Sequence, residues 1–208
     1  PICRPAAAKR MAVNEAAAEA ASFVEKWRTR WPEWGIARVF VRADQCELAE
    51  HWFALLQEWT DAASTTEPAP GLAKLAWWQE ELRGWAKGAR RHPLGARLQK
   101  QPVDWNAVAD ALPALAHRGE QLDAPALSRL AQALSDAEQR LFDEQRDGKS
   151  SIDHLLGEAL GRIQKPDEAS GGTRPRRILS ALALKRAQTG QSPVPPLGTL
   201  RCSWRAAR

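Results

Sequence analysis

This 208-residue sequence contains no tyrosine and few β-branched residues, the side chains most enriched in β-strands. Alanine and leucine, both strong helix formers, are abundant, and ten tryptophans are present. The composition therefore predicts an all-α protein. A chain of this length buries enough surface to form one compact domain.

Cysteine is also scarce. Cys3, Cys46 and Cys202 are odd in number, lie far apart and form no CxxC pair, so they imply neither a disulfide framework nor a zinc site. No apolar run approaches the roughly 18 residues needed to cross a bilayer, and the N-terminus has no signal-peptide hydrophobic stretch. We therefore expect a cytoplasmic protein, with peripheral membrane contact as the remaining alternative.

The end of the chain lacks acidic residues, since none follows Glu168. Its basic residues are Arg174, Arg176, Arg177, Lys185, Arg186, Arg201, Arg205 and Arg208. Such a segment can meet phosphates, anionic lipid or an acidic partner. A solvated basic surface on terminal helices is the interpretation we favour, and contact with an anionic membrane is kept as an alternative.

The tryptophan-dense stretch 74–85 (KLAWWQEELRGW) has the spacing of a helix. Leu75, Trp78, Leu82 and Trp85 recur three or four residues apart, so they share one face. Breaker residues at 64–71 should end the preceding helix and start this one, which we expect to run to about residue 90. The pattern predicts a core helix with a polar edge.

Similar patterns predict several further helices. They are expected at residues 23–31, 45–63, 94–100, 104–117, 123–148, 151–164 and 175–187. Asp44, with Glu47 three residues later, is expected to cap the 45–63 helix, and Asp104 and Asp123 to cap two later ones. Pro113 should kink or divide its helix. The apolar run 36–41 is interpreted as a connector or helical turn, because no second strand candidate exists to pair with it.

The chain divides into four predicted parts. Residues 1–21 have few large apolar groups and should be flexible, and residues 22–164 form the helical domain. Residues 165–174 read as a linker loop. Residues 175–208 are expected to form basic helices docked on the same domain, and the last segment contains Leu197, Leu200 and Trp204.

Three sequence pieces occur in a characteristic order: 52–64 (WFALLQEWTDAAS), 74–82 (KLAWWQEEL) and the turn His92-Pro93-Leu94. Together they resemble the squalene/phytoene synthase family, in which an aromatic helix with an Asp-rich motif precedes a Lys-Leu-x-x-Trp helix and a His-Pro turn. The resemblance covers roughly residues 45–98. It implies an isoprenoid synthase-like helical bundle, complete or truncated.

Active members of that family, as the resemblance implies, join two prenyl diphosphates with Mg²⁺ held by two Asp-x-x-x-Asp motifs on facing helices. Carboxylates four residues apart share a helix face, so both can bind one metal cluster. Here the first motif has Thr60 and Ser64 at its metal-binding ends and keeps only Asp61 between them. Gln57 and Gln79 also stand where the family has arginines that help to bind phosphate. The resemblance therefore implies a lost metal site.

The second motif has one literal candidate, the pair Asp143 and Asp147, at a predicted helix end just before Gly148. A solvated helix end is the interpretation we favour, so no metal site, no cofactor and no catalytic residue is expected. The pair is kept only for the alternative in which the chain is a divergent Mg²⁺-dependent prenyl transferase.

A ligand pocket is the remaining expectation from the resemblance, between the 45–63 helix and the 74–85 stretch. Its candidate residues are Trp59, Asp61, Trp77, Trp78 and Glu81. Such a pocket would be apolar and suit an isoprenoid or a lipid. Core packing is the alternative for the tryptophans. Ion pairing with Lys74 or Arg83 is the alternative for the carboxylates, including nearby Glu58.

These observations predict a non-catalytic synthase-like protein with a binding, scaffold or assembly role. Its partner would be an apolar isoprenoid or lipid, or another protein. The alternatives are the divergent prenyl transferase and a basic module that binds anionic lipid or nucleic acid. Nucleic acid is the least favoured partner, because no helix-turn-helix, zinc or RNA-binding signature accompanies the arginines.

Overall fold

The computed structural model describes residues 5–116, 123–144 and 171–208, and these ranges form helices and connecting turns without a strand. The predicted all-α class is confirmed. The helix expected at 151–164 and most of the expected linker lie outside the described residues. None of the described helices is long and apolar enough to cross a membrane.

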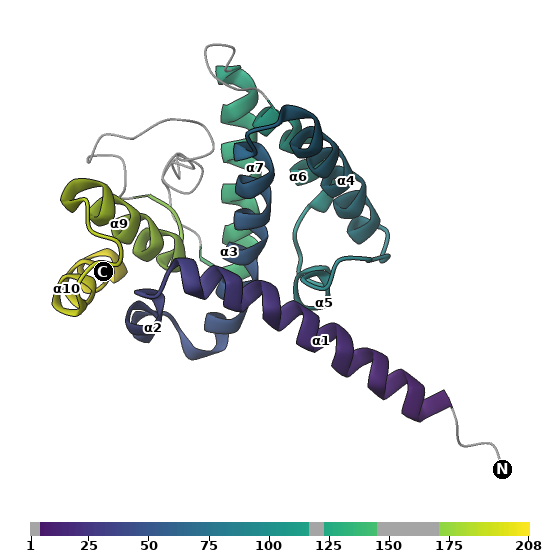
Figure 1. Ribbon diagram of the computed structural model, residues 1–208, viewed down its shortest axis with the longest axis horizontal. Helices are drawn as coiled ribbons and strands as arrows, with labels where there is room; N and C mark the ends of the chain where they lie inside the picture. Colours follow the sequence, from purple (N-terminus) through teal and green to yellow (C-terminus); the bar gives the residue numbers. More distant parts are fainter. Residues whose placement is uncertain (1–4, 117–122, 145–170) are drawn as a thin grey trace.

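Helix α1 (Pro5–Arg30) begins near the N-terminus and ends at the centre of the structure (Figure 1). Its N-terminal half extends away from the other helices. It includes most of the segment expected to be flexible, and the alanines there are strong helix formers. Near its C-terminal end, Val24 and Trp27 are buried in the core, where α1 packs on α3.

Two short helical turns, α2 (Trp34–Ala37) and η1 (Arg38–Phe40), connect α1 to α3 (Ala43–Ser64). The interpretation of 36–41 as a helical turn is confirmed. The predicted cap at Asp44 is wrong, because α3 already begins at Ala43 and Arg42 occupies the N-cap position. Asp44 lies in the first turn, where a carboxylate still interacts favourably with the helix dipole, and it pairs with Arg42 at 2.7 Å.

Helix α4 (Pro68–Ala86) begins earlier than expected, because Pro68 takes a first-turn position where its missing N–H costs no hydrogen bond. It also ends earlier than predicted, and Gly88 then adopts φ 85°. The following helix α5 (Gly95–Leu98) lies against α3 and close to the ring of Trp85.

The next helices are α6 (Trp105–Ala111), η2 (Leu112–Ala116) and α7 (Ala124–Phe142). The side chains of Asp104 and Asp123 accept hydrogen bonds from the backbone N–H groups of Ala107 and Ala126, which confirms both predicted caps. The predicted division at Pro113 is confirmed, since the α-helix gives way to the 3₁₀ helix there. Helix α7 ends well before Gly148.

Helix α9 (Arg174–Thr189) is tied to two distant parts of the chain. Arg176 forms a fully buried ion pair with Glu138 of α7, and Trp52 of α3 donates to the same carboxylate at 2.7 Å. Arg186 pairs with Glu33 beside α2 at 2.5 Å. These contacts hold α9 against α7 and against the start of α2.

Helix α10 (Pro196–Ala207) packs on α9 and α2 (Figure 1). Its buried residues include Thr199 and Ser203, each 0% exposed. The apolar residues named from the sequence are not buried by this contact: Leu197 is 82%, Leu200 40% and Trp204 46% exposed. The segment therefore docks through small and polar residues and leaves its large apolar ones at the surface.

Tryptophan dominates the interior of the described fold. The fully buried indoles are Trp27, Trp34, Trp52, Trp59, Trp78 and Trp85. Trp34 meets Trp27 and Phe53 edge to face, at centroid distances of 5.4 and 5.5 Å. The assignment of Trp27 and Trp85 to the core is confirmed.

Candidate functional site

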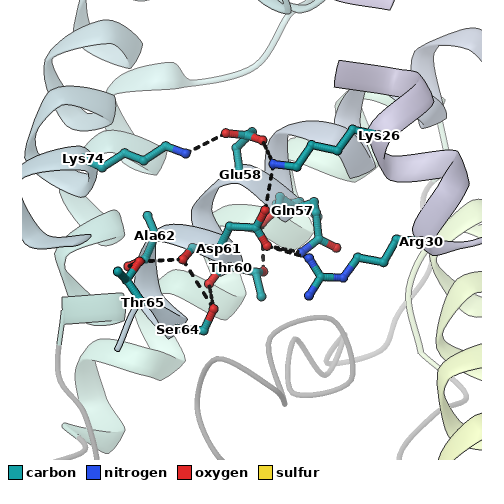
Figure 2. A network of polar contacts seen from close by, with 11 residues as sticks. Lys26, Arg30, Gln57, Glu58, Thr60, Asp61, Ala62, Ser64, Thr65 and Lys74 are labelled. Atoms are coloured by element: carbon teal, nitrogen blue, oxygen red, sulfur yellow. Dashed lines mark hydrogen bonds and ion pairs between the residues drawn. The ribbon is translucent and has the colours of Figure 1, made fainter. Parts of the chain in front are cut away.

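The candidate site lies where α1, α3 and α4 face one another (Figure 2). Helix α3 supplies the carboxylates Glu58 and Asp61, and Lys26 of α1 lies between them, with its Nζ 2.7 Å from Glu58 Oε1 and 2.9 Å from Asp61 Oδ2. Arg30 of α1 reaches Asp61 Oδ1 at 2.7 Å. Lys74 of α4 reaches Glu58 Oε2 at 2.7 Å. Each carboxylate is thus held by two cations.

This pairing sets the charge state of the carboxylates. Burial alone raises the pKa of Glu58, but hydrogen bonds and charge from Lys26 and Lys74 bring that pKa below its usual value. Burial likewise raises the pKa of Asp61, and hydrogen bonds from Lys26 and Gln57 with the charge of Arg30 lower it overall. Burial lowers the pKa of Lys26, and the two carboxylates more than reverse that effect. Glu58, Asp61 and Lys26 are therefore charged at neutral pH.

The hydroxyls at the two ends of the first motif are bonded to the helix itself. Thr60 donates to the carbonyl of Leu56 at 2.9 Å, and Ser64 donates to the carbonyl of Thr60 at 2.9 Å. Thr60 is buried. Between them, Asp61 also accepts a hydrogen bond from Gln57 at 2.8 Å. The motif positions therefore present helix-bonded hydroxyls and a carboxylate paired with two cations (Figure 2).

Glu81, the other carboxylate proposed for the pocket, has different partners. It accepts from the indole N–H of Trp85 at 2.8 Å, from the backbone N–H groups of Arg91 and His92 at 2.6 and 2.8 Å, and from the Arg91 guanidinium at 2.9 Å. Burial alone raises the pKa of Glu81, and these donors lower it overall. Glu81 therefore anchors the turn after α4.

The expected ion pairing of carboxylates is found, with one difference in partners. Lys74 pairs with Glu58 as predicted. Arg83 instead pairs with Glu80 and Asp110 on the open surface, at 3.2 and 3.0 Å.

Three of the five candidate residues do lie together: the tryptophans. Trp59 and Trp78 are 0% exposed and meet edge to face, with ring centroids 6.2 Å apart. The ring centroid of Trp77 lies 5.2 Å from that of Trp78. Trp77 is 38% exposed, with the Arg91 guanidinium 5.4 Å from its ring centre. Because Trp59 and Trp78 are fully buried, their ring contacts are those of core packing. A pocket bounded by all five residues stays a prediction.

His92 lies beside this aromatic group, with its ring 4.4 Å from that of Trp78 between centroids. Burial lowers the pKa of His92 to about 4, against the opposing charges of Glu58 and Glu81. The imidazole is therefore neutral at pH 7. Its Nδ1 accepts from the backbone N–H of Leu94 at 3.2 Å, which closes the His-Pro turn.

The first of the two weak metal candidates, Asp143, lies beyond the end of its helix. Helix α7 stops at Phe142, and Asp143 follows in the left-handed conformation with φ 48°, exposed to solvent. Asp147 lies outside the described residues. The i,i+4 argument for this pair needed a helix that continued past 143, and that expectation is wrong. Among the described residues, no group of three or more His, Cys, Asp or Glu side chains is placed to hold a metal ion.

A groove of about 290 Å³ lies elsewhere, between α1, α3 and α5. None of the five candidate residues lines it. Its most buried charge is Glu50, which is 2% exposed and pairs with Arg28 at 2.5 Å and with Arg38 at 3.3 Å. This carboxylate also accepts from the indole N–H of Trp34 at 3.2 Å, so its polar capacity is already used within the fold.

Sequence reasoning missed Lys26 and Arg30. These two cations lie four residues apart on α1 and therefore on one face of the helix, which was a readable signal. The helix at 23–31 was predicted from its apolar residues, and the partners of its cations were not considered. Without α1, Asp61 would have lacked both of its cationic partners.

Comparison with protein-family models, curated proteins and solved structures finds no match to this chain. The resemblance to squalene/phytoene synthases accordingly depends on the three sequence pieces, and its functional implications stay predictions.

Proposed function

We propose that this chain is a non-catalytic, squalene/phytoene synthase-like helical protein with a binding, scaffold or assembly role. The supporting observation is the state of Asp61, the single carboxylate left in the first motif. Lys26 and Arg30 occupy both of its oxygens at 2.9 and 2.7 Å. The carboxylate is therefore part of the packing between α1 and α3.

This arrangement of side chains is unfavourable for binding Mg²⁺. Mg²⁺ prefers several oxygen ligands with carboxylate charge, and the motif ends offer neutral hydroxyls that already donate to helix carbonyls. The local charge is also unfavourable, since Lys26, Arg30 and Lys74 outnumber Glu58 and Asp61. An incoming dication would have to displace ammonium and guanidinium groups that already satisfy the carboxylates.

The aromatic packing favours the scaffold form of this proposal over an isoprenoid pocket at this position. Trp59 and Trp78 are wholly buried in ring-to-ring contact. An isoprenoid chain placed between α3 and α4 would have to displace these rings, and exposing or moving buried aromatics is energetically costly. A protein partner bound at the outer helix faces requires no such rearrangement.

A product assay tests the proposal. The purified chain is incubated with a C15 and a C20 prenyl diphosphate and Mg²⁺, and pyrophosphate release and hydrocarbon product are measured. We expect no release above that of a protein-free control. Turnover that disappears in Asp61→Ala would refute the proposal, and turnover that disappears in Asp143→Ala would favour the divergent prenyl transferase.

A further inference from the structure

The outer face of α10 carries a set of large side chains that no described helix covers. Leu197, Leu200 and Trp204 are 82%, 40% and 46% exposed. They recur at intervals of three and four residues, the spacing of one helix face. Exposed apolar residues that cluster in this way commonly mark a contact surface, whereas isolated ones do not.

Basic residues lie on the same face. At about 100° per residue, the exposed Arg201 and Arg205 fall with the three apolar residues inside an arc of about 140°, and the exposed Arg208 directly follows the helix. The Arg208 guanidinium stacks on the Trp204 ring, 3.7 Å from its centroid, so charge and aromatic surface are presented together. Arg201 and Arg205 form no ion pair within the described part of the chain.

The opposite face fixes the helix to the body. Thr199 and Ser203 are wholly buried, and Thr199 donates to the carbonyl of Val194 at 3.1 Å. Arg177 of α9 donates to the carbonyl of Ala206 at 2.8 Å. Because α10 is held through this face, its outer arc is presented in a fixed orientation.

We propose that the outer face of α10 docks on an anionic lipid surface, with Leu197, Leu200 and Trp204 entering the interface and the arginines meeting lipid phosphates. The charge supports this occupant, since residues 169–208 contain no Asp or Glu that would repel anionic headgroups. Leucine and tryptophan on one face with flanking arginine is the composition of helices that lie in the plane of a membrane. This inference goes beyond the proposed function and does not depend on the metal motif.

Vesicle flotation with the full chain tests this docking. One vesicle set contains equal parts phosphatidylglycerol and phosphatidylcholine, and the other contains phosphatidylcholine alone. We expect binding to the anionic set, much weaker binding to the neutral set, and weakening as salt is raised. The double variant Arg201→Gln/Arg205→Gln should lower the partition coefficient about 25-fold, because each cation near an anionic surface contributes about fivefold. The double variant Leu197→Ser/Trp204→Ser should lower it about tenfold or more.

Two matched controls distinguish the effect of the α10 face from a general effect of surface charge or hydrophobicity. Lys87→Gln/Arg90→Gln removes the same charge from exposed positions just after α4, and Leu72→Ser removes an exposed leucine from α4. Both should bind like the wild type. All variants change exposed residues, so circular dichroism and the thermal midpoint should match the wild type and establish that the fold is intact.

Several results would overturn the docking proposal. They are equal binding to neutral vesicles, absence of binding to both sets, and an equal loss in the control variants. If only the arginine variant weakened binding, the apolar residues would not enter the interface, and the proposal would fail. Binding to an acidic polypeptide, lost in the arginine variant, without vesicle binding would show that the surface serves an acidic protein instead.

Discussion

Replacement of Asp61 by asparagine distinguishes a structural carboxylate from one kept for metal binding. The change removes the charge that Lys26 and Arg30 approach while preserving the shape of the side chain. A carboxylate held for a metal without its ion is an unfavourable feature of a fold, and neutralising such a group commonly stabilises the protein. A carboxylate already paired with cations has the opposite effect, since its loss leaves them without a partner.

The expected change in stability follows from the solvent exposure of the paired side chains. Lys26 is 54% and Arg30 42% exposed, whereas Asp61 is 22% exposed. Solvated ion pairs contribute about 0.2–1 kcal/mol each, so two such pairs suggest that Asp61→Asn lowers the free energy of unfolding by about 1 kcal/mol. In a double-mutant cycle with Lys26→Met, the coupling energy should be about 0.5 kcal/mol.

Urea unfolding followed by tryptophan fluorescence measures this change, and its pH dependence has a defined sign. The pKa of Asp61 is lowered in the folded state, so its contribution is complete above the ordinary value of 3.8 and is lost as pH falls through the lowered value. The difference between wild type and variant should therefore be constant from about pH 5 to 8. Asp110→Asn is the control, because Asp110 pairs on the open surface and should show a smaller change. An Asp61→Asn variant as stable as the wild type, or more stable, would refute the structural role.

Three further substitutions test the packing around the site. Glu138→Gln leaves the buried Arg176 guanidinium without its counter-charge and should lower the free energy of unfolding by about 3–5 kcal/mol in a urea titration. The wild type should lose stability as pH falls from 6.5 towards 4, because the pKa of His92 is lowered to about 4 in the folded state and protons therefore bind the unfolded chain preferentially in this pH range. The variant His92→Asn should not show that loss. That loss is about 2 kcal/mol, after discounting the shift for the partial exposure of the ring. Gly95→Ala places a Cβ 2.9 Å from the Trp85 ring and should cost about 1–3 kcal/mol, seen as a lower thermal midpoint.

Each of these predictions has a contradicting outcome. A Glu138→Gln variant with unchanged unfolding would show that the buried pair contributes no net stability. Parallel loss of stability by wild type and His92→Asn between pH 6.5 and 4.5, above the range in which the lowered carboxylates titrate, would exclude His92 as the cause. Gly35→Ala is the control for Gly95→Ala, because a Cβ at Gly35 meets no atom within 4 Å. Equal midpoints for the two alanine variants would contradict the close approach to Trp85.

Helix existence was predictable from the sequence, because apolar residues at intervals of three and four mark the buried faces of α3, α4 and α7. Helix ends were predictable where a local cap decides them, as at Asp104 and Asp123. The end of α7 was not, because it involves a distant contact: the carbonyl of the buried Phe142 accepts a hydrogen bond from Gln45 of α3 at 2.6 Å. No local pattern near residue 142 encodes that partner.

The candidate site was predictable only in part for the same reason. Hydroxyl residues at Thr60 and Ser64, where the resemblance implies carboxylates, are visible in the sequence, and so is the grouping of the tryptophans. The different partners of Asp61 and Glu81 are not visible there, because Lys26 and Arg30 reach Asp61 from 31 residues or more away, and Glu81 accepts from the His92 backbone. The outward face of α10 was also missed, because an amphipathic stripe has the same spacing whether it faces a core or solvent.

Calorimetric titration of the chain with a non-hydrolysable prenyl diphosphate, with Mg²⁺ and then with EDTA, tests most directly the proposal that Asp61 serves structure and binds no metal. The engagement of Asp61 by Lys26 and Arg30 predicts no binding that depends on Mg²⁺. The same heats should be recorded in both conditions and for the Asp61→Asn variant. Tight binding that requires Mg²⁺ and disappears in Asp61→Asn would contradict the proposal that this site is structural.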